Sequence, residues 1–414
     1  MRLALLFTFL LPAFFTLSSA KQKKSDQPKQ EKFTVLVKNA KAALKDQSKQ
    51  EVALKALLDA RNRPELSNRQ RADLYYTAAL LEESLNGIEN RKAYLSQAYD
   101  TAKFFNKLRD MYTQLQRCDS VDILPDATGK VHPRWQKKAQ ELRLRHHRNI
   151  LEGGKFFLVK KNYAEAYPFF DIYCKYRAQE PDTLYPQAVL WATLSAFQVD
   201  NYFGTIKYVD DAISGTDSAT AAILQEYKVR SYANLGIDSA WVASLKQGVE
   251  NYPDHDYFFV QLADWYQGQR AFDEERRLAD KLISRTGGKA IHYYAKSKSY
   301  LSEDNYDACI ACADSTIALQ SDFADAYYNK GIAFLNKALI SQEMSSKDAK
   351  SPEYVADKRR TQELYRQAQP CMEMVRRLQP DKQERWASPL YRIYLNLNLG
   401  DDFTEIERLL NQQQ

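Results

Sequence analysis

The sequence predicts an all-α protein, a right-handed α-solenoid built from successive helical hairpins. Three observations support this fold class. The chain of 414 residues is too long for one compact core, because single cores stop growing at roughly 250–300 residues. Glycine and proline are scarce, at 13 residues each, which disfavours a fold with many turns. The third observation is an internal repeat, and helical repeats of this kind stack into solenoids.

The repeat is anchored on the residue that opens the second helix of each hairpin. The anchors, aromatic in all units but one, are Tyr163, Tyr202, Asp238, Phe272 and Tyr306. They are separated by 39, 36, 34 and 34 residues. A period of 34 residues is the signature of the tetratricopeptide repeat (TPR), a helix–turn–helix unit. The predicted units begin near His147, Pro186, Ala222, Asp256, Ala290 and Ala324, with a partial unit from Gln383.

Each predicted hairpin has two positions that must be small, because its paired helices touch there. These pairs are Gly154 with Ala166, Thr193 with Thr205, Ser297 with Cys309, and Gly331 with Ala368. Two units depart from the pattern, with Val229 opposite Trp241 and Ala263 opposite Glu275. Either the helices splay in these two units, or the register is wrong by one residue.

We expect the array to span residues 134–382, with an unusually long hairpin at 324–382 and C-terminal capping helices at 383–414. Within the long hairpin, Ser351-Pro352-Glu353 is typical of a helix start, with serine as N-cap and proline at the first helical position. The simplest interpretation lengthens both helices, so that the hairpin projects beyond the stack and residues 345–350 form its tip.

The region before the array is predicted to be helical but irregular. Residues 31–117 are expected to form degenerate TPR-like helical hairpins, and residues 118–133 a loop that contains Pro125, Gly129 and Pro133. Proline removes a backbone donor and blocks helix continuation. The loop therefore separates the irregular hairpins from the regular array.

Residues 1–20 have the pattern of a secretory signal peptide. Arg2 supplies the positive charge, residues 3–17 are mostly apolar, and Ser18-Ser19-Ala20 offers small residues at a cleavage site. Cleavage after Ala20 leaves a polar, disordered segment at 21–30 and predicts a periplasmic or envelope-associated protein. The alternative is an uncleaved anchor, but about 15 apolar residues are too few for a bilayer core that needs about 20. No cysteine follows the cleavage site to carry a lipid, and no transmembrane helix is predicted in the mature chain.

Several segments resemble the exported TPR proteins common in Bacteroidetes. The resemblance is carried by Cys118-Asp119-Ser120, by Asn149-Ile150-Leu151-Glu152-Gly153-Gly154, by Tyr163-Ala164-Glu165-Ala166-Tyr167-Pro168-Phe169-Phe170, and by the long unit from Tyr327-Tyr328-Asn329-Lys330-Gly331 to Leu378-Gln379-Pro380. It covers most of the mature chain. Such a resemblance implies a binding module of the cell envelope and supplies no catalytic residues.

The cysteines predict no disulfide framework and no redox site. The set, Cys118, Cys174, Cys309, Cys312 and Cys371, is odd and sparse, although one or two bridges remain open. A redox CxxC motif needs its first cysteine at a helix N-terminus, whereas Cys309 is expected inside a second helix at the small packing position. Zinc would need further ligands, and none lies at ligand spacing.

Other candidates for chemistry are equally weak, and we predict no catalytic, metal or cofactor site. His146 and His147 lie in the basic run 143–148, where we expect a solvated basic helix face and no carboxylate to orient an imidazole. Gly153-Gly154-Lys155 and Gly287-Gly288-Lys289 lack the GxxxxGK[ST] frame of a phosphate loop. The sequence therefore predicts that the protein is not an enzyme.

Partner binding is predicted in the concave groove that the first helices of stacked hairpins line. The candidate positions are Leu151, Lys155, Leu190, Leu194, Arg230, Asp264, Tyr294, Lys298, Tyr328 and Ile332. They mix bases, one acid, aromatic and aliphatic side chains. We expect an extended or helical protein segment with acidic groups, and the net charge of +6 agrees weakly with this choice. The alternative is that these are ordinary groove residues without a single ligand.

The function that the sequence favours is a non-enzymatic, protein-binding scaffold of the cell envelope. An alternative is a carbohydrate-binding or nutrient-uptake accessory protein of the outer membrane, a class that usually needs a lipidated cysteine. A nucleic-acid partner is not expected, because it conflicts with the signal peptide.

Overall fold

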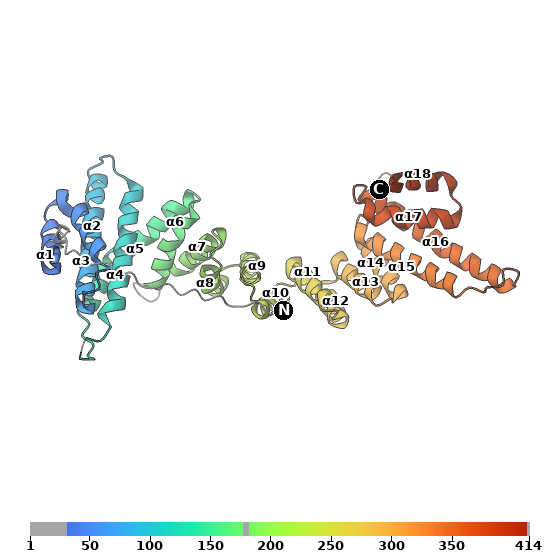
Figure 1. The fold of residues 1–414 in the computed structure, drawn as a ribbon, viewed down its shortest axis with the longest axis horizontal. Coiled ribbons are helices and arrows are strands. Elements are labelled where there is room, and N and C mark those ends of the chain that lie inside the picture. Colours follow the sequence, from blue (N-terminus) through green and yellow to red (C-terminus); the bar gives the residue numbers. More distant parts are fainter. Residues whose placement is uncertain (1–30, 127, 177–181, 412–414) are drawn as a thin grey trace, which may run out of the picture. The chain divides into compact units, whose positions relative to one another are not determined.

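A computed structural model describes residues 31–126, 128–176 and 182–411 (Figure 1). The proposed signal peptide and the polar segment that follows it lie outside these ranges. The described residues form 18 α-helices and one short 3₁₀ helix, and they contain no β-strand. The predicted all-α class is confirmed. The chain divides into two compact units, residues 1–149 and 150–414.

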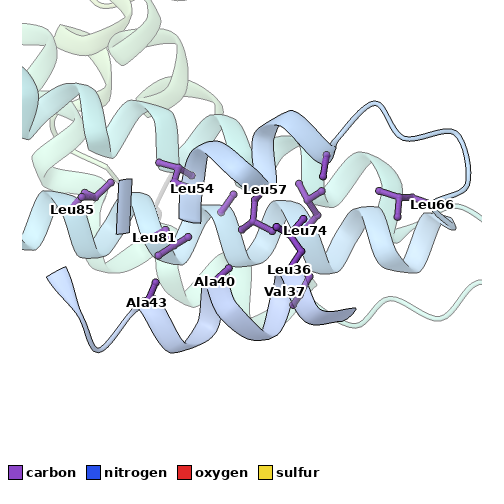
Figure 2. Packing of buried hydrophobic residues seen from close by; sticks show 12 residues of the cluster. Leu36, Val37, Ala40, Ala43, Leu54, Leu57, Leu66, Leu74, Leu81 and Leu85 are labelled. Carbon is purple, nitrogen blue, oxygen red and sulfur yellow. The ribbon is translucent and has the colours of Figure 1, made fainter. Parts of the chain in front are cut away.

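The N-terminal unit consists of paired helices with one shared core. Its elements are α1 (Phe33–Ala43), the 3₁₀ helix (Gln47–Lys49), α2 (Gln50–Ala60), α3 (Asn68–Tyr94), α4 (Thr101–Asp122) and the start of α5 (Gln136–Val159). Leucines at helical spacing on α3, among them Leu74, Leu81 and Leu85, meet Leu57 of α2 and Leu36 of α1 (Figure 2). One apolar stripe per helix is enough to form this core.

The predicted start of the loop at 118–133 is wrong, because α4 continues to Asp122. Cys118 is fully buried, and its thiol donates to the Ala72 carbonyl of α3 at 3.5 Å. The carboxylate of Asp122 accepts the backbone N–H groups of Arg134 and Trp135, both at 2.8 Å, just before α5. Packing of the helix end and this capping interaction therefore extend α4, and no proline interrupts it before Pro125.

The C-terminal unit is an α-solenoid of helical hairpins. After α5 its helices are α6 (Tyr163–Lys175), α7 (Tyr185–Gln198), α8 (Tyr202–Ser214), α9 (Ser218–Asn234), α10 (Asp238–Asn251), α11 (Asp256–Gly268), α12 (Phe272–Thr286), α13 (Ala290–Ser302), α14 (Tyr306–Leu319), α15 (Ala324–Glu343), α16 (Pro352–Leu378), α17 (Gln383–Leu397) and α18 (Gly400–Asn411). From α6 onward each helix contacts the next. The first helices α11, α13, α15 and α17 also contact one another in order.

One turn recurs between the two helices of a hairpin. A left-handed residue, at φ between 56° and 67°, lies two positions before each second helix at Lys161, Asp200, Gly236, Arg270 and Asp304. In three of these turns the next residue is an asparagine whose side chain accepts a backbone N–H of the helix, as in Asn162, Asn201 and Asn305. This asparagine N-cap fixes the helix start. All five second helices begin on the predicted anchor residue, so the register is confirmed.

The register also holds in the two units that depart from the small-residue pattern. Glu275 occupies its predicted packing position and is 1% exposed, opposite the buried Ala263. In the other unit Trp241 is partly buried against the cluster that contains Val229, and a Cβ atom on Gly248 of α10 would crowd the Phe258 ring of α11. A partly buried tryptophan and a buried carboxyl therefore occupy the two positions that the pattern expects to be small.

Candidate binding surface on the first helices

The predicted groove positions lie on the first helices of the C-terminal unit, and one of them is buried. Leu151 is fully buried, so its assignment to the partner-binding surface is wrong. Ile150 and Gly154 of α5 are also buried, and Gly154 faces the Phe170 ring of α6. Lys155, on the same helix, is partly exposed.

The remaining positions form what we call the first-helix row: Lys155, Leu190, Leu194, Arg230, Asp264, Tyr294, Lys298, Tyr328 and Ile332. Arg230 and Asp264 are exposed and the others are half-buried. The structure places these residues on the successive first helices α5, α7, α9, α11, α13 and α15. Contacts between neighbouring first helices, shown for α11, α13 and α15, bring the corresponding parts of the row together.

The cations of the row have partners within the protein. The Lys155 ammonium lies 2.9 Å from Glu152 and 5.5 Å from the centre of the Trp191 ring on α7. Lys298 of α13 forms an ion pair with Asp264 of α11 at 3.0 Å. The two members of this pair are 36% and 61% exposed. Exposed pairs of this kind contribute less than about 1 kcal/mol, so an incoming carboxylate can exchange with the internal one.

Arg230 of α9 likewise has an acidic and an aromatic partner. It pairs with Glu226 on its own helix, and its guanidinium lies 5.4 Å from the ring centre of Tyr257 on α11. The Trp191 and Tyr257 rings were missed by sequence reasoning, because neither occupies the repeat position of the row. A search for aromatic residues on the neighbouring first helix would have found them, since cations stack on such rings.

The C-terminal end of the row is aromatic. Tyr294 packs against Phe323 with ring centres 5.0 Å apart, and burial raises its pKa to about 12. Its hydroxyl therefore stays protonated at neutral pH. Arg385 of α17 lies 4.4 Å from the centre of the Tyr328 ring and also bonds to Asp325. This part of the row offers flat, amphipathic side chains, which protein interfaces favour.

Four of the five cysteines are buried, and Cys312 is half-buried. Burial raises the pKa of Cys309 to about 11, and its sulfur lies 3.4 Å from the Ser297 hydroxyl inside the hairpin. Burial also raises the pKa of Cys312, and it raises those of Cys118 to about 12 and Cys371 to about 11. A thiol with a raised pKa is a poor nucleophile. The packing role predicted for the CxxC motif agrees with these surroundings.

The basic run 143–148 is not a fully solvated face, which corrects the expectation from sequence. Arg143 and His147 are 7% and 6% exposed. The Arg143 guanidinium pairs with Asp119, and its carbonyl accepts the Tyr112 hydroxyl at 2.6 Å. His146 meets the carboxylate of Glu83 at 2.9 Å. Glu83 is on α3, so its role is visible only once the chain is folded.

In the two glycine-lysine segments the glycines allow close helix packing or end a helix. Gly154 lies in the middle of α5, where a Cβ atom would come within 2.5 Å of the Phe170 ring. Gly287 and Gly288 end α12 with φ of 80°.

Across the described residues, no group of three or more histidine, cysteine or acidic side chains is placed to hold a metal ion.

A hollow of about 860 Å³ in the N-terminal unit was also missed. It lies between the start of α3 and the segment after α4, and Ser67, Asn68, Asp122, Lys130 and His132 are among its walls. The Asp122 carboxylate there already accepts two backbone N–H groups.

No helix in the described part of the chain is both long enough and apolar enough to cross a bilayer.

No family model matches the sequence, and no curated protein matches it. Among solved structures, the C-terminal part of a TPR repeat-containing protein from Cytophaga hutchinsonii is 14% identical, with a TM-score of 0.41 over 62% of this chain and 92% of its own. A TPR repeats protein from Bacteroides fragilis is 17% identical, with a TM-score of 0.31 over 64% and 98%. A tetratricopeptide repeat protein from Parabacteroides merdae is 10% identical, with a TM-score of 0.34 over 64% and 98%. These scores are low, so the fold assignment rests on the helix pairs of this chain.

Proposed function

We propose that the protein is a non-enzymatic scaffold that holds a segment of another protein along the first-helix row. The observation that supports this proposal is the continuous contact of first helices α11, α13, α15 and α17, which forms one surface from several repeats. The exposed and half-buried groups of the row include an exchangeable ion pair, two cations beside aromatic rings, and aliphatic side chains. A protein segment with carboxylates and apolar residues matches this mixture.

Four of the cysteines are poor candidates for a catalytic nucleophile. The pKa values of Cys118, Cys309, Cys312 and Cys371 are all raised by burial, which makes each a weak nucleophile.

We also propose that the protein acts in the cell envelope, on the basis of the charge, apolar run and small residues within positions 1–20. N-terminal sequencing of the protein recovered from a periplasmic fraction tests this step. The expected first residue is Lys21. Recovery of a chain that still begins at Met1, from the cytoplasmic fraction, contradicts it.

Charge reversal of the row tests the binding proposal. The triple variant Lys155→Glu, Arg230→Glu and Lys298→Glu places three acids where an acidic segment is expected to lie. Chemical cross-linking in intact cells, followed by quantitative mass spectrometry, then measures the recovered partner. We expect recovery to fall about tenfold or more, because like charges across an interface cost several kcal/mol in total.

A matched control reverses three exposed cations on second helices: Lys175 of α6, Lys246 of α10 and Arg277 of α12. The change in net charge is the same, so a general electrostatic effect would reduce recovery in both triples. Equal recovery from the row variant and the unmodified protein would move the binding site away from the first helices.

A further inference from the structure

The hairpin of α15 and α16 is longer than the helices that cover it. α15 has 20 residues and α16 has 27, whereas the neighbouring α14 and α17 have 14 and 15. The excess of α16 over α17 corresponds to about 18 Å of helix at 1.5 Å per residue. Figure 1 shows the connected ends of α15 and α16 extending past α14 and α17. The distal part of this hairpin therefore lacks the helices that cover its proximal part.

The distal part is held together by its own contacts. The hydroxyls of Ser341 on α15 and Thr361 on α16 are 3.0 Å apart, and Thr361 is buried. The Asp357 carboxylate accepts the backbone N–H of Ser346 at 3.1 Å. Ser351 caps α16 by accepting the N–H of Tyr354 at 3.0 Å. The two helices thus form an ordered pair without a third helix on this face.

A groove of about 230 Å³ runs between the two helices in this region. We call it the tip groove. On one side its walls are Lys337, Ile340 and Ser341 of α15 and the C-cap residue Met344. On α16 they are Asp357, Arg360 and Leu364. These positions recur every three or four residues, so each helix presents one continuous face. A groove with such walls on two packed helices has the shape that accepts a third helix.

The floor of the tip groove is apolar and open. Met344 is 81% exposed and Ile340 is 39% exposed, and Leu364 is half-buried. Lys337 reaches Asp307 at the start of α14, so the groove continues the face of α15 on which α14 lies. Further along the hairpin an exposed apolar surface takes the place of that helix. An apolar surface with polar edges is typical of a protein-binding site.

The tip groove has two basic walls, Lys337, which pairs with Asp307, and Arg360. Arg360 is 68% exposed, and its pair with Asp357 is long, at 3.5 Å. Asp357 is engaged by the Ser346 N–H, so part of its charge is compensated within the hairpin. Lys358 and Arg359 beside it are also exposed. The charge that complements these edges is negative.

We propose that the tip groove binds an amphipathic helix of a partner protein, with apolar residues against Ile340, Met344 and Leu364 and carboxylates facing Lys337 and Arg360. A second copy of this chain is a poorer occupant, because two tip grooves would bring the same cations together. This surface is separate from the first-helix row.

A peptide-display selection on the intact protein tests the proposal. The library presents helical peptides with a fixed leucine stripe, and the positions that flank the stripe are randomised among glutamate, lysine and glutamine. We expect glutamate to be enriched at the flanks, and the enrichment to disappear with Arg360→Glu. For a selected peptide, Met344→Glu should weaken binding about tenfold or more, because it places a carboxylate within the apolar floor.

Val355→Glu is the matched control. Val355 is exposed on the same hairpin, at 46%, but it is not a wall of the tip groove. We expect the selected peptide to bind this variant as it binds the unmodified protein. The proposal is overturned if no helical peptide is enriched, if the flanks show no preference for glutamate, or if Val355→Glu and Met344→Glu weaken binding equally. A dimer in sedimentation equilibrium that Met344→Glu dissociates would assign the groove to a second copy and overturn the proposed occupant.

Discussion

Side chains at the contact between paired helices decide how closely each hairpin packs. Gly154 is such a position in the first hairpin, since an added Cβ would lie 2.5 Å from the Phe170 ring. Gly268, the last residue of α11, has no atom within 4 Å of such a Cβ. The two glycines are both helical but have opposite surroundings. Their substitutions separate the cost of crowding from the gain in helix propensity.

We predict that Gly154→Ala destabilises the C-terminal unit by about 1–3 kcal/mol, because the Phe170 ring must move in a packed interior. Gly268→Ala is expected to be neutral or to stabilise by up to about 1 kcal/mol, because alanine loses less backbone entropy on folding. Urea unfolding followed by circular dichroism measures both. A Gly154→Ala variant as stable as the Gly268→Ala variant would show that the hairpin is looser than described.

Glu275 is a second packing residue with a measurable consequence. Burial raises its pKa to about 7, while nearby Lys298 lowers it and Asp264 raises it. In the unfolded chain the carboxyl is expected near its ordinary value of 4.5. As pH rises from 4.5 to 7, the unfolded state loses this proton first. The stability contributed by the protonated carboxyl is therefore full below this interval and lost above it.

We predict that Glu275→Gln has a free energy of unfolding at pH 8 that is roughly 1–3 kcal/mol higher than that of the unmodified protein. Urea unfolding measures this difference, which should shrink toward pH 4.5. Glutamine keeps the shape and removes the titration. Glu82 of α3, whose pKa burial also raises to about 7, is unchanged in this variant and contributes equally to both proteins. An identical difference at pH 5 and pH 8 would contradict the assignment of a buried, protonated carboxyl.

The hairpins share a turn in which one residue adopts the left-handed backbone conformation. Arg270, at φ of 56°, adopts the left-handed conformation that Gly236 provides in the preceding hairpin. Residues with a side chain lose roughly 1 kcal/mol in this conformation, whereas glycine does not. The repeated geometry therefore comes from the requirement to reverse direction between helices, and the residue type at this position is free to vary.

We predict that Arg270→Gly stabilises the C-terminal unit by about 0.5–1 kcal/mol and that Gly236→Ala destabilises it by a similar amount. Both residues lie in turns, so neither change removes a core contact. Thermal unfolding of the two variants measures the effect. Equal shifts in the same direction would show that strain in this turn does not control stability.

The sequence predicted the second-helix starts because their signals are local. Asn162 and Tyr163, or Asn305 and Tyr306, combine an N-cap with an aromatic at the start of the helix. Three other features depend on residues distant in sequence and could not be read locally. They are the continuation of α4 to Asp122, the burial of Arg143 against Asp119, and the burial of Leu151. In each, tertiary packing decides the outcome.

The whole chain combines a solenoid of repeated hairpins with an N-terminal unit that has its own leucine-rich core. In a repeat protein each hairpin contacts mainly its neighbours, so one binding surface is assembled from many repeats. The sequence located the row that we propose as this surface. It did not reveal that Lys298 pairs with Asp264, or that Trp191 and Tyr257 lie under Lys155 and Arg230.

Site-specific photo-cross-linking in intact cells tests most directly whether the first-helix row holds a partner. A photoreactive amino acid replaces Leu194, Arg230 or Ile332 in the row, and Lys175 or Lys246 on second helices serves as the reference. We predict that the row positions give covalent adducts with one common partner and that the reference positions do not. Adducts of equal yield from the second helices, or none from the row, would contradict the proposal that stacked first helices form the binding surface.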